Sequence, residues 1–205
     1  MESAAVRVRG WAFPYTEGRL AWGPGDTFVY RDTDFGGASY HLEQWRFYRS
    51  EQFLMRAMPW EVVDARYQEK TWSEIKSRHP ERKYTKEPAG FLSFLALIYL
   101  VTQAYIFAAN LTKEAGLDAS VEMRVRLRGI QDWALGPTES SRALYDIYMA
   151  RTNTAEYVHS LSREILMATP TASAIPAITS LFRQFGWMSP PSPETIAQHQ
   201  RGMTR

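Results

Sequence analysis

The stretch from Gly90 to Thr112 constrains the fold most, because it contains no charged side chain. A run of about 20 uncharged residues is long enough to cross a bilayer as a helix, and it is equally suited to a protein interior. Gln103 lies near its middle, where a polar amide is unfavourable in lipid. We therefore interpret the segment Gly90–Leu111 as a central helix buried against a sheet. A membrane span and interfacial binding are the alternatives.

One later segment, Val121–Ile130, shows the strict alternation of apolar and polar residues that is typical of a half-buried strand. The N-terminal half contains further segments with strand composition, separated by Gly- and Asp-rich loops at Glu17–Asp26 and Asp32–Gly37. A helix over His41–Tyr48 is an alternative there. The predicted N-terminal strands are Ala5–Trp11, Thr27–Arg31, Tyr40–Arg49 and Gln52–Met58. The last two are two separate strands or one hairpin, whose turn would be Arg49–Glu51.

Helical periodicity and punctuation by proline and glycine predict several helices besides the central one. Gly186 has the position of a residue that ends the last helix in a left-handed conformation. Beyond it, three prolines and two serines between Ser189 and Pro193 indicate a loose tail. The predicted helices are Trp60–Ser77, Ser140–Arg151, Ala155–Met167 and Ala177–Phe185.

This order of elements predicts the fold class. Segregated strands and helices favour an α+β fold, with a mainly antiparallel sheet from the N-terminal half plus one later strand. The long apolar helix and the C-terminal helices would pack on that sheet. A length of 205 residues fits one domain, which we place at residues 1–188, followed by a flexible tail at residues 189–205.

The absence of cysteine excludes a disulfide framework, a thiol nucleophile and a thiolate metal site. The first residues, Met1–Ala5, lack a basic region followed by an apolar core, so no secretory signal is expected. A cytoplasmic location is the default expectation. A net charge of only +2 does not mark a strong binder of polyanions.

No catalytic signature stands out in the sequence. The four histidines (His41, His79, His159 and His199) have no close metal-binding spacing, and neither a nucleophile elbow nor a phosphate-binding loop is present. We therefore expect no cofactor, no metal and no enzymatic activity. Asp32 and Asp34, near Glu43 and His41, would be the residues of a metal-dependent nuclease, although aspartates in turns more often bind their own backbone.

Arginines form the most informative pattern. Because side chains alternate along a strand, Arg124, Arg126 and Arg128 share one face, and so do Arg7 and Arg9. If the two strands are neighbours, five guanidinium groups line one sheet face, which Arg46 would extend. Such a face suits phosphate groups or an acidic protein, because guanidinium forks bind both bidentately. A solvated face that is partly paired with carboxylates is the alternative.

Two segments carry a resemblance to a known group of proteins. Residues Arg9–Tyr15 (RGWAFPY) and Glu43–Phe53 (EQWRFYRSEQF) resemble uncharacterised bacterial proteins in which this region accompanies a Schlafen-type AlbA_2 domain, a putative DNA-binding module. The match covers residues 6–60, and this chain has Glu51 where that pattern has glycine. The AlbA_2 module itself is absent, so no catalytic residue carries over. The resemblance implies an accessory role in nucleic-acid-associated or antiviral defence assemblies.

These observations together predict a non-enzymatic interaction or accessory subunit of a bacterial assembly. Its partner would be another protein subunit, bound through the arginines and through the aromatic residues Trp11, Tyr15 and Trp22, since Trp, Tyr and Arg dominate interface energetics. Direct nucleic-acid binding through the arginine face, with Trp11 and Tyr15 stacking on bases, is the alternative. A metal-dependent nuclease is the third, and a membrane partner is not expected.

Overall fold

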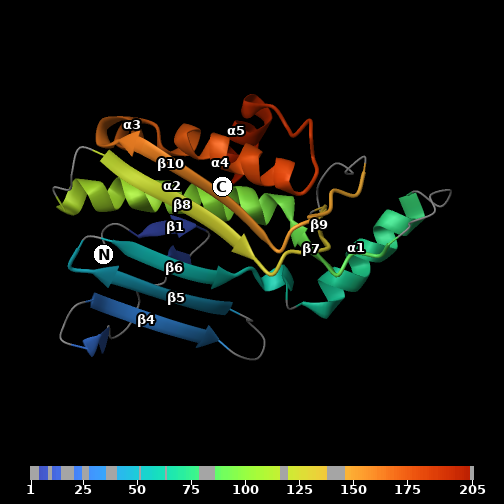
Figure 1. Cartoon of the computed structure of the whole chain (residues 1–205), viewed down its shortest axis with the longest axis horizontal. Helices are drawn as coiled ribbons and strands as arrows, with labels where there is room; N and C mark the ends of the chain where they lie inside the picture. The colour runs from blue at the N-terminus through green and yellow to red at the C-terminus, as the bar shows by residue number, and fades with distance from the viewer. Residues whose placement is uncertain are drawn as a thin grey trace.

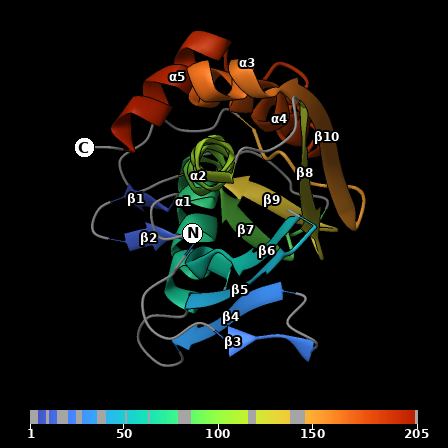
Figure 2. The ribbon, with the colours of Figure 1, turned by 90° about the vertical axis from the view of Figure 1, so that its left-hand side faces the viewer.

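The computed structural model describes ten stretches of the chain: residues 5–8, 11–14, 21–24, 28–35, 41–50, 52–62, 64–78, 86–115, 120–137 and 146–203. They form antiparallel sheets and helices, so the predicted α+β class is confirmed. One long helix, α2 (Phe94–Ala115), runs through the centre of the molecule. Seen along its axis, α2 is surrounded by the C-terminal helices, a two-stranded ribbon, a four-stranded sheet and a short N-terminal hairpin (Figure 2).

The four-stranded sheet is antiparallel, and its strand order follows the sequence (Figure 1). The hairpin predicted around residues 49–51 is confirmed, because Phe47 pairs with Phe53 and Trp45 with Met55. The helical alternative for residues 41–48 is therefore wrong. The strands are β3 (Ala21–Trp22), β4 (Phe28–Phe35), β5 (His41–Tyr48) and β6 (Phe53–Met58).

Two N-terminal expectations need correction. The single strand predicted over residues 5–11 is instead a hairpin of β1 (Val6–Val8) and β2 (Trp11–Phe13), in which Val8 pairs with Trp11. The turn predicted over residues 32–37 is wrong for its first part, because β4 continues to Phe35. Pairing along the whole of β5 outweighs the turn preference of the aspartates.

The charge-free stretch does not form one helix from end to end. Its first residues are the buried strand β7 (Gly90–Ser93), which pairs in parallel with β9 (Trp133–Gly136). The helix α2 then begins, and the Ser93 hydroxyl accepts a hydrogen bond of 3.2 Å from the Ala96 amide. A serine that satisfies a free amide of the first turn is a favoured helix start. This cap marks where the strand ends.

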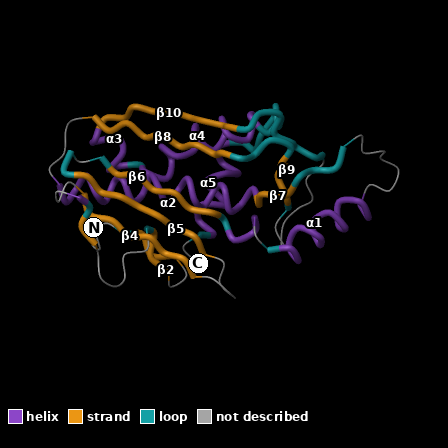
Figure 3. The backbone as a smooth tube through the Cα atoms, turned by 60° about the horizontal axis from the view of Figure 1, so that its bottom comes forward, coloured by secondary structure: helices purple, strands orange, loops and turns teal. Residues whose placement is uncertain are grey.

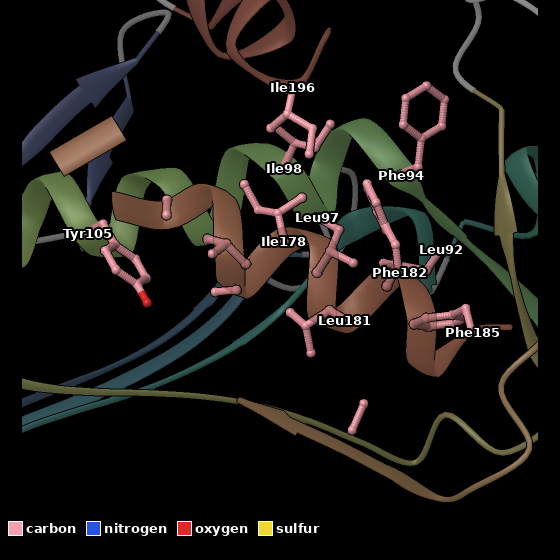
Figure 4. Packing of buried hydrophobic residues seen from close by; sticks show 14 of the residues in the cluster. Leu92, Phe94, Leu97, Ile98, Tyr105, Ile178, Leu181, Phe182, Phe185 and Ile196 are labelled. Carbon is pink, nitrogen blue, oxygen red and sulfur yellow. The ribbon is translucent and has the colours of Figure 1, made fainter. Parts of the chain in front are cut away.

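The main core lies between α2 and the C-terminal helices (Figure 4). Leu97, Ile98 and Tyr105 of α2 are fully buried there, and so are Ile178 and Phe182 of α4 (Pro170–Gln184). The first nineteen residues of α2, residues 94–112, include none that is exposed. Among the described residues, α2 is the one helix that is long and apolar enough to cross a membrane, with half of its most apolar stretch buried.

A second, smaller core joins α2 to the sheet and the hairpin. Phe107 and Leu111 are buried against Val6 of β1, and Phe47 and Phe53 pack on the same cluster. The rings of Phe53 and Phe107 lie 4.6 Å apart, within the range of a favourable aromatic pair. The predicted packing of the apolar helix on the sheet thus runs through these aromatic residues.

The strand predicted over residues 121–130 is confirmed as β8 (Ser120–Arg128). Its partner is β10 (Thr154–Ser162), so the helix predicted over residues 155–167 is wrong for most of its length. Ala155, Tyr157 and Leu161 turn inward, a period of two that suits a strand. The helix α3 (Arg163–Ala168) begins only after Ser162, which accepts a bond from the Ile165 amide.

The helix predicted over residues 140–151 is also wrong where the structure describes it. Residues 146–151 are extended beside β9: the Leu135 amide donates to the Tyr148 carbonyl and the Ala150 amide to the Trp133 carbonyl. Earlier in the chain, the helix predicted over residues 60–77 divides into a short turn, η2 (Trp60–Val62), and α1 (Ala65–Arg78).

The end of α4 follows the predicted glycine stop. Gly186 has a positive φ of 82°, and its amide donates to the Arg183 carbonyl, while the Trp187 amide donates to the Phe182 carbonyl. This is the Schellman pattern, and the accompanying apolar contact is present because the Phe182 and Trp187 rings lie 5.3 Å apart. The helix begins earlier than predicted, at Pro170, and continues through Pro176.

The flexible tail predicted for residues 189–205 is wrong over α5 (Pro193–Gly202). Ser192 caps this helix by accepting a bond from the Thr195 amide, and Pro193 occupies its first turn. Ile196 is fully buried, and the side-chain amide of Gln200 donates to the Thr102 hydroxyl of α2 at 3.0 Å. The helix is thus anchored to the core by an apolar and a polar contact.

Because α5 contributes to the core, we expect Ile196→Ala to lower the free energy of unfolding by about 2–5 kcal/mol. Urea denaturation followed by circular dichroism measures this change. The matched control is Gln198→Ala on the exposed side of α5, for which the change should stay within about 0.5 kcal/mol. Equal stabilities of the two variants would mean that α5 is not anchored.

Candidate interaction surface

The predicted arginine strand presents one regular, solvent-exposed face. β8 and β10 pair over their full length and form the two-stranded ribbon. Burial alternates along β8, so that every second residue of this strand is exposed. We call this the ribbon face. It is formed by Glu122, Arg124, Arg126 and Arg128 of β8 and by Glu156 and Val158 of β10.

Charges on the ribbon face are partly paired. Arg126 lies directly opposite Glu156, and its Nε donates to the Glu156 carboxylate at 2.8 Å. Arg124 reaches Glu122 at 3.2 Å and Glu156 at 3.8 Å. Arg128 forms no ion pair within the part of the chain that the structure describes. The face thus keeps unneutralised positive charge at the Arg128 end of β8.

The ribbon is held by its opposite face and by one glutamine. Met123, Val125 and Leu127 pack on the main core from β8, together with Tyr157 from β10. On the outer edge of β10, the side-chain amide of Gln184 accepts from the Glu156 amide and donates to the Glu156 carbonyl, both at 3.1 Å. This clamp fixes β10 to α4, and β10 in turn pairs with the strand that carries the exposed arginines.

The six predicted arginines are not brought together on one face. β1, which carries Arg7, pairs with β2 rather than with β8, and α2 lies between the hairpin and the ribbon (Figure 2). Arg9 lies outside the described residues. Arg46 belongs to β5, and its guanidinium donates to the Trp45 carbonyl at 2.9 Å. Since β1 and β8 are not neighbours, the predicted five-arginine face is wrong, and among the described side chains the three arginines of β8 share a surface.

The predicted aromatic contacts are separated as well. Trp22 of β3 is 57% exposed, with the Arg49 guanidinium 6.0 Å from its ring centre. β3 lies at the far edge of the four-stranded sheet, away from the ribbon (Figure 2). Trp11 belongs to β2, and Tyr15 lies outside the described residues. The structure thus places Trp22 away from the ribbon face.

The residues of the nuclease alternative lie on two paired strands. Asp32 and Asp34 belong to β4 and not to a turn, and His41 begins β5. Glu43 pairs with Thr33 and is only 3% exposed. A search of the described residues finds no group of three or more His, Asp or Glu side chains that could hold a metal ion.

A buried polar cluster that the sequence did not predict lies where η2, α1, β7 and β9 meet. The side-chain amide of Gln68 accepts from the Phe91 amide at 2.6 Å and donates to the Phe91 carbonyl at 2.9 Å, so it closes the edge of β7 as Gln184 closes that of β10. Tyr67 donates to the Pro137 carbonyl at 3.3 Å. Glu61 is 5% exposed, and its Oε2 has no hydrogen-bond partner within the described part of the chain.

Burial governs the acid–base behaviour of this cluster. It raises the pKa of Glu61, an effect only partly offset by a hydrogen bond from the residue's own backbone amide. Burial raises the pKa of Tyr67 to about 12, and the Glu61 charge adds a smaller increase. Hydrogen bonds with Thr71 and Ser93 lower this pKa and offset part of the rise. Gly136 makes the cluster possible, because a Cβ there would lie 2.8 Å from the Tyr67 hydroxyl.

A second buried polar pair lies beneath the ribbon. The Tyr105 hydroxyl and Nδ1 of His159 are both buried and have no hydrogen-bond partner among the described residues. The centres of their two rings are 6.5 Å apart. Burial raises the pKa of Tyr105, with a smaller contribution from Tyr157. His199, predicted to lie in the tail, packs edge-on against Phe94 at 5.7 Å. Among the described residues, neither histidine belongs to a group of three or more His, Asp or Glu side chains that could hold a metal ion.

Comparisons of the chain with protein-family models, with curated proteins and with solved structures found no match. The class that the structure defines is therefore architectural: an α+β protein with a central helix and an exposed, arginine-bearing ribbon. Its functional interpretation depends on the geometry described above.

The burial of Glu61 predicts a pH-dependent stability. Since its pKa is raised above 4.5, the ordinary value, the folded state holds the proton more tightly, and the free energy of unfolding should fall as pH rises past that value. Glu61→Gln removes this charge, so we expect the variant to be more stable than the parent at neutral pH. The advantage should shrink towards zero below pH 4.5.

Chemical denaturation at a series of pH values measures this difference. The control is Glu69→Gln, an exposed glutamate on α1, which should leave the pH dependence unchanged. A stability difference between Glu61→Gln and the parent that is constant with pH would contradict the assignment.

Proposed function

We propose that the protein is a non-enzymatic interaction domain that binds an acidic segment of a protein partner through the ribbon face. The observation that carries the proposal is the exposed row of Arg124, Arg126 and Arg128 on a strand whose other face is anchored in the core. A rigid row of guanidinium groups is suited to bind carboxylates bidentately.

The surroundings of the arginines favour a protein partner over a nucleic acid. Glu122 and Glu156 lie among them and form ion pairs, so three arginines and two glutamates leave a net charge of +1 on the ribbon face. Affinity for a phosphate backbone grows with the number of phosphates neutralised, and the two carboxylates work against it. Val158, which is 44% exposed beside Arg124, adds an apolar contact of the kind found in protein interfaces.

An accessory role agrees with the resemblance of residues 6–60 to bacterial proteins that accompany a Schlafen-type AlbA_2 domain. That resemblance concerns the N-terminal hairpin and the four-stranded sheet, whereas the ribbon face lies outside it. The proposed partner surface is therefore argued from the ribbon alone. Direct nucleic-acid binding is the alternative that the same experiment distinguishes.

The test compares two triple variants in binding to a fluorescent octapeptide of alternating Glu and Val. Replacing Arg124, Arg126 and Arg128 with Gln should weaken binding by at least about tenfold, since charge-assisted contacts are lost. The control removes three exposed cations elsewhere (Arg66→Gln, Lys113→Gln, Arg183→Gln) and should change affinity less than about threefold. Fluorescence anisotropy measures both.

Folding and partner class are checked in parallel. Exposed ion pairs contribute about 0–1 kcal/mol, so the ribbon variant should melt close to the parent temperature. Equal losses in the two variants would show that only net charge matters, and the proposed surface would be wrong. Binding to a DNA duplex that is tighter than to the peptide, falls steeply with salt and is lost in the ribbon variant would support the nucleic-acid alternative instead.

A further inference from the structure

The ribbon has one open edge. β8 is hydrogen-bonded to β10 on one side, and on its other side it pairs with no strand of the described chain. β6 is likewise the last strand of the four-stranded sheet and pairs only with β5. The arrows of β6 and β8 point in the same direction in Figure 1, and in Figure 3 β8 and β6 come one after the other between β10 and β5.

The hydrogen bonds of Gln184 to Glu156 determine which backbone groups of β8 face the open edge. In an antiparallel pair, directly opposite residues bond to each other or both point away, in alternation along the strands. Glu156 uses both its amide and its carbonyl for Gln184, so it points away from β8. Its opposite residue, Arg126, must therefore direct its amide and carbonyl to the open edge, and so must Arg124 and Arg128.

The open edge differs from the two strand edges that the chain closes itself. Gln184 satisfies the backbone of Glu156 on β10, and Gln68 satisfies the backbone of Phe91 on β7. In the described part of the chain, no side chain or backbone group bonds to the edge-facing amides of Arg124 and Arg126. Exposed unpaired edges are templates for another strand.

The side chains around the edge indicate what kind of strand would fit. Leu54 and Met58 of β6 are 41% and 39% exposed, and Arg56 between them is exposed as well. The exposed arginines of β8 carry the same sign of charge as Arg56. A strand added beside β8 would therefore meet cations on its exposed face.

We propose that the partner of this protein adds an extended segment with alternating acidic and apolar residues to the open edge of β8, beside Arg124 and Arg126. Backbone hydrogen bonds would supply pairing, and its carboxylates would contact the arginines. This inference rests on the proposed function, because it specifies how the acidic segment binds to the ribbon face. The charge of the edge is the reason for an acidic strand and not for a neutral one.

Amide hydrogen exchange tests the mode of binding directly. In the free protein, the amides of Arg124 and Arg126 should exchange at least about tenfold faster than those of Met123, Val125 and Leu127, which bond to β10. Saturation with the alternating Glu–Val octapeptide should slow the two arginine amides to the rates of their neighbours. Residue-resolved exchange by NMR provides both measurements.

Two methylated peptides give the matched control. Methylation of either all Glu or all Val amide nitrogens removes the donors from one edge of an extended peptide and keeps every side chain. At least one of them should bind about tenfold more weakly than the parent peptide. A peptide of alternating Lys and Val should not bind, because its charges would oppose those of the edge.

The outcomes separate the two proposals. Peptide binding that depends on the arginines, without amide protection and without an effect of either methylation, would overturn strand addition and leave the ribbon face as a side-chain contact surface. Failure of the peptide to bind at all would overturn both. Protection of the Arg124 and Arg126 amides in the free protein, together with a dimer mass by light scattering, would show that a second copy occupies the edge and would overturn the proposal. If the arginines only keep the edge from pairing, no protection should appear with any peptide.

Discussion

Burial of α2 is the constraint on which the rest of the structure depends. A helix with no charge between its first residue and Thr112 has no face suited to water, so it needs neighbours in every direction. The C-terminal helices, the ribbon, the sheet and the N-terminal hairpin supply them (Figure 2). Each of them contributes apolar side chains to one of the two cores that enclose α2.

Packing around one helix leaves small, separate sheets instead of one continuous one. Small sheets have many edges, and two of these edges are each closed by hydrogen bonds from a single side chain. Two glutamines, Gln68 and Gln184, imitate a neighbouring strand by offering a donor and an acceptor from one side chain. The arginines of β8 are left on an edge without such a cover, which is why this strand is the centre of both proposals.

Sequence reasoning succeeded where a local pattern and the tertiary structure agree. The alternation in β8, the hairpin of β5 and β6 and the glycine stop at Gly186 are local signals, and the fold leaves them unchanged. It failed at β10, where Ala155 to Leu161 have residues compatible with either period, and pairing with β8 decides. The buried state of Glu61 has no local signal, because η2 packs against β7, which is distant in sequence, as well as against α1.

The parallel pairing of β7 with β9 has a consequence for synthesis on the ribosome. Gly90 pairs with Trp133, so β7 must wait for a partner that is made after α2 and β8 are complete. The residues that cover the main apolar side of α2, in α4 and α5, emerge later still. A nascent chain that has reached Pro137 thus carries an apolar helix whose main side is still uncovered. Exposed apolar surface of this kind is what chaperones recognise, and it leads to aggregation when it persists. The core of this protein can therefore be completed only after its C-terminal helices, α4 and α5, have been synthesised.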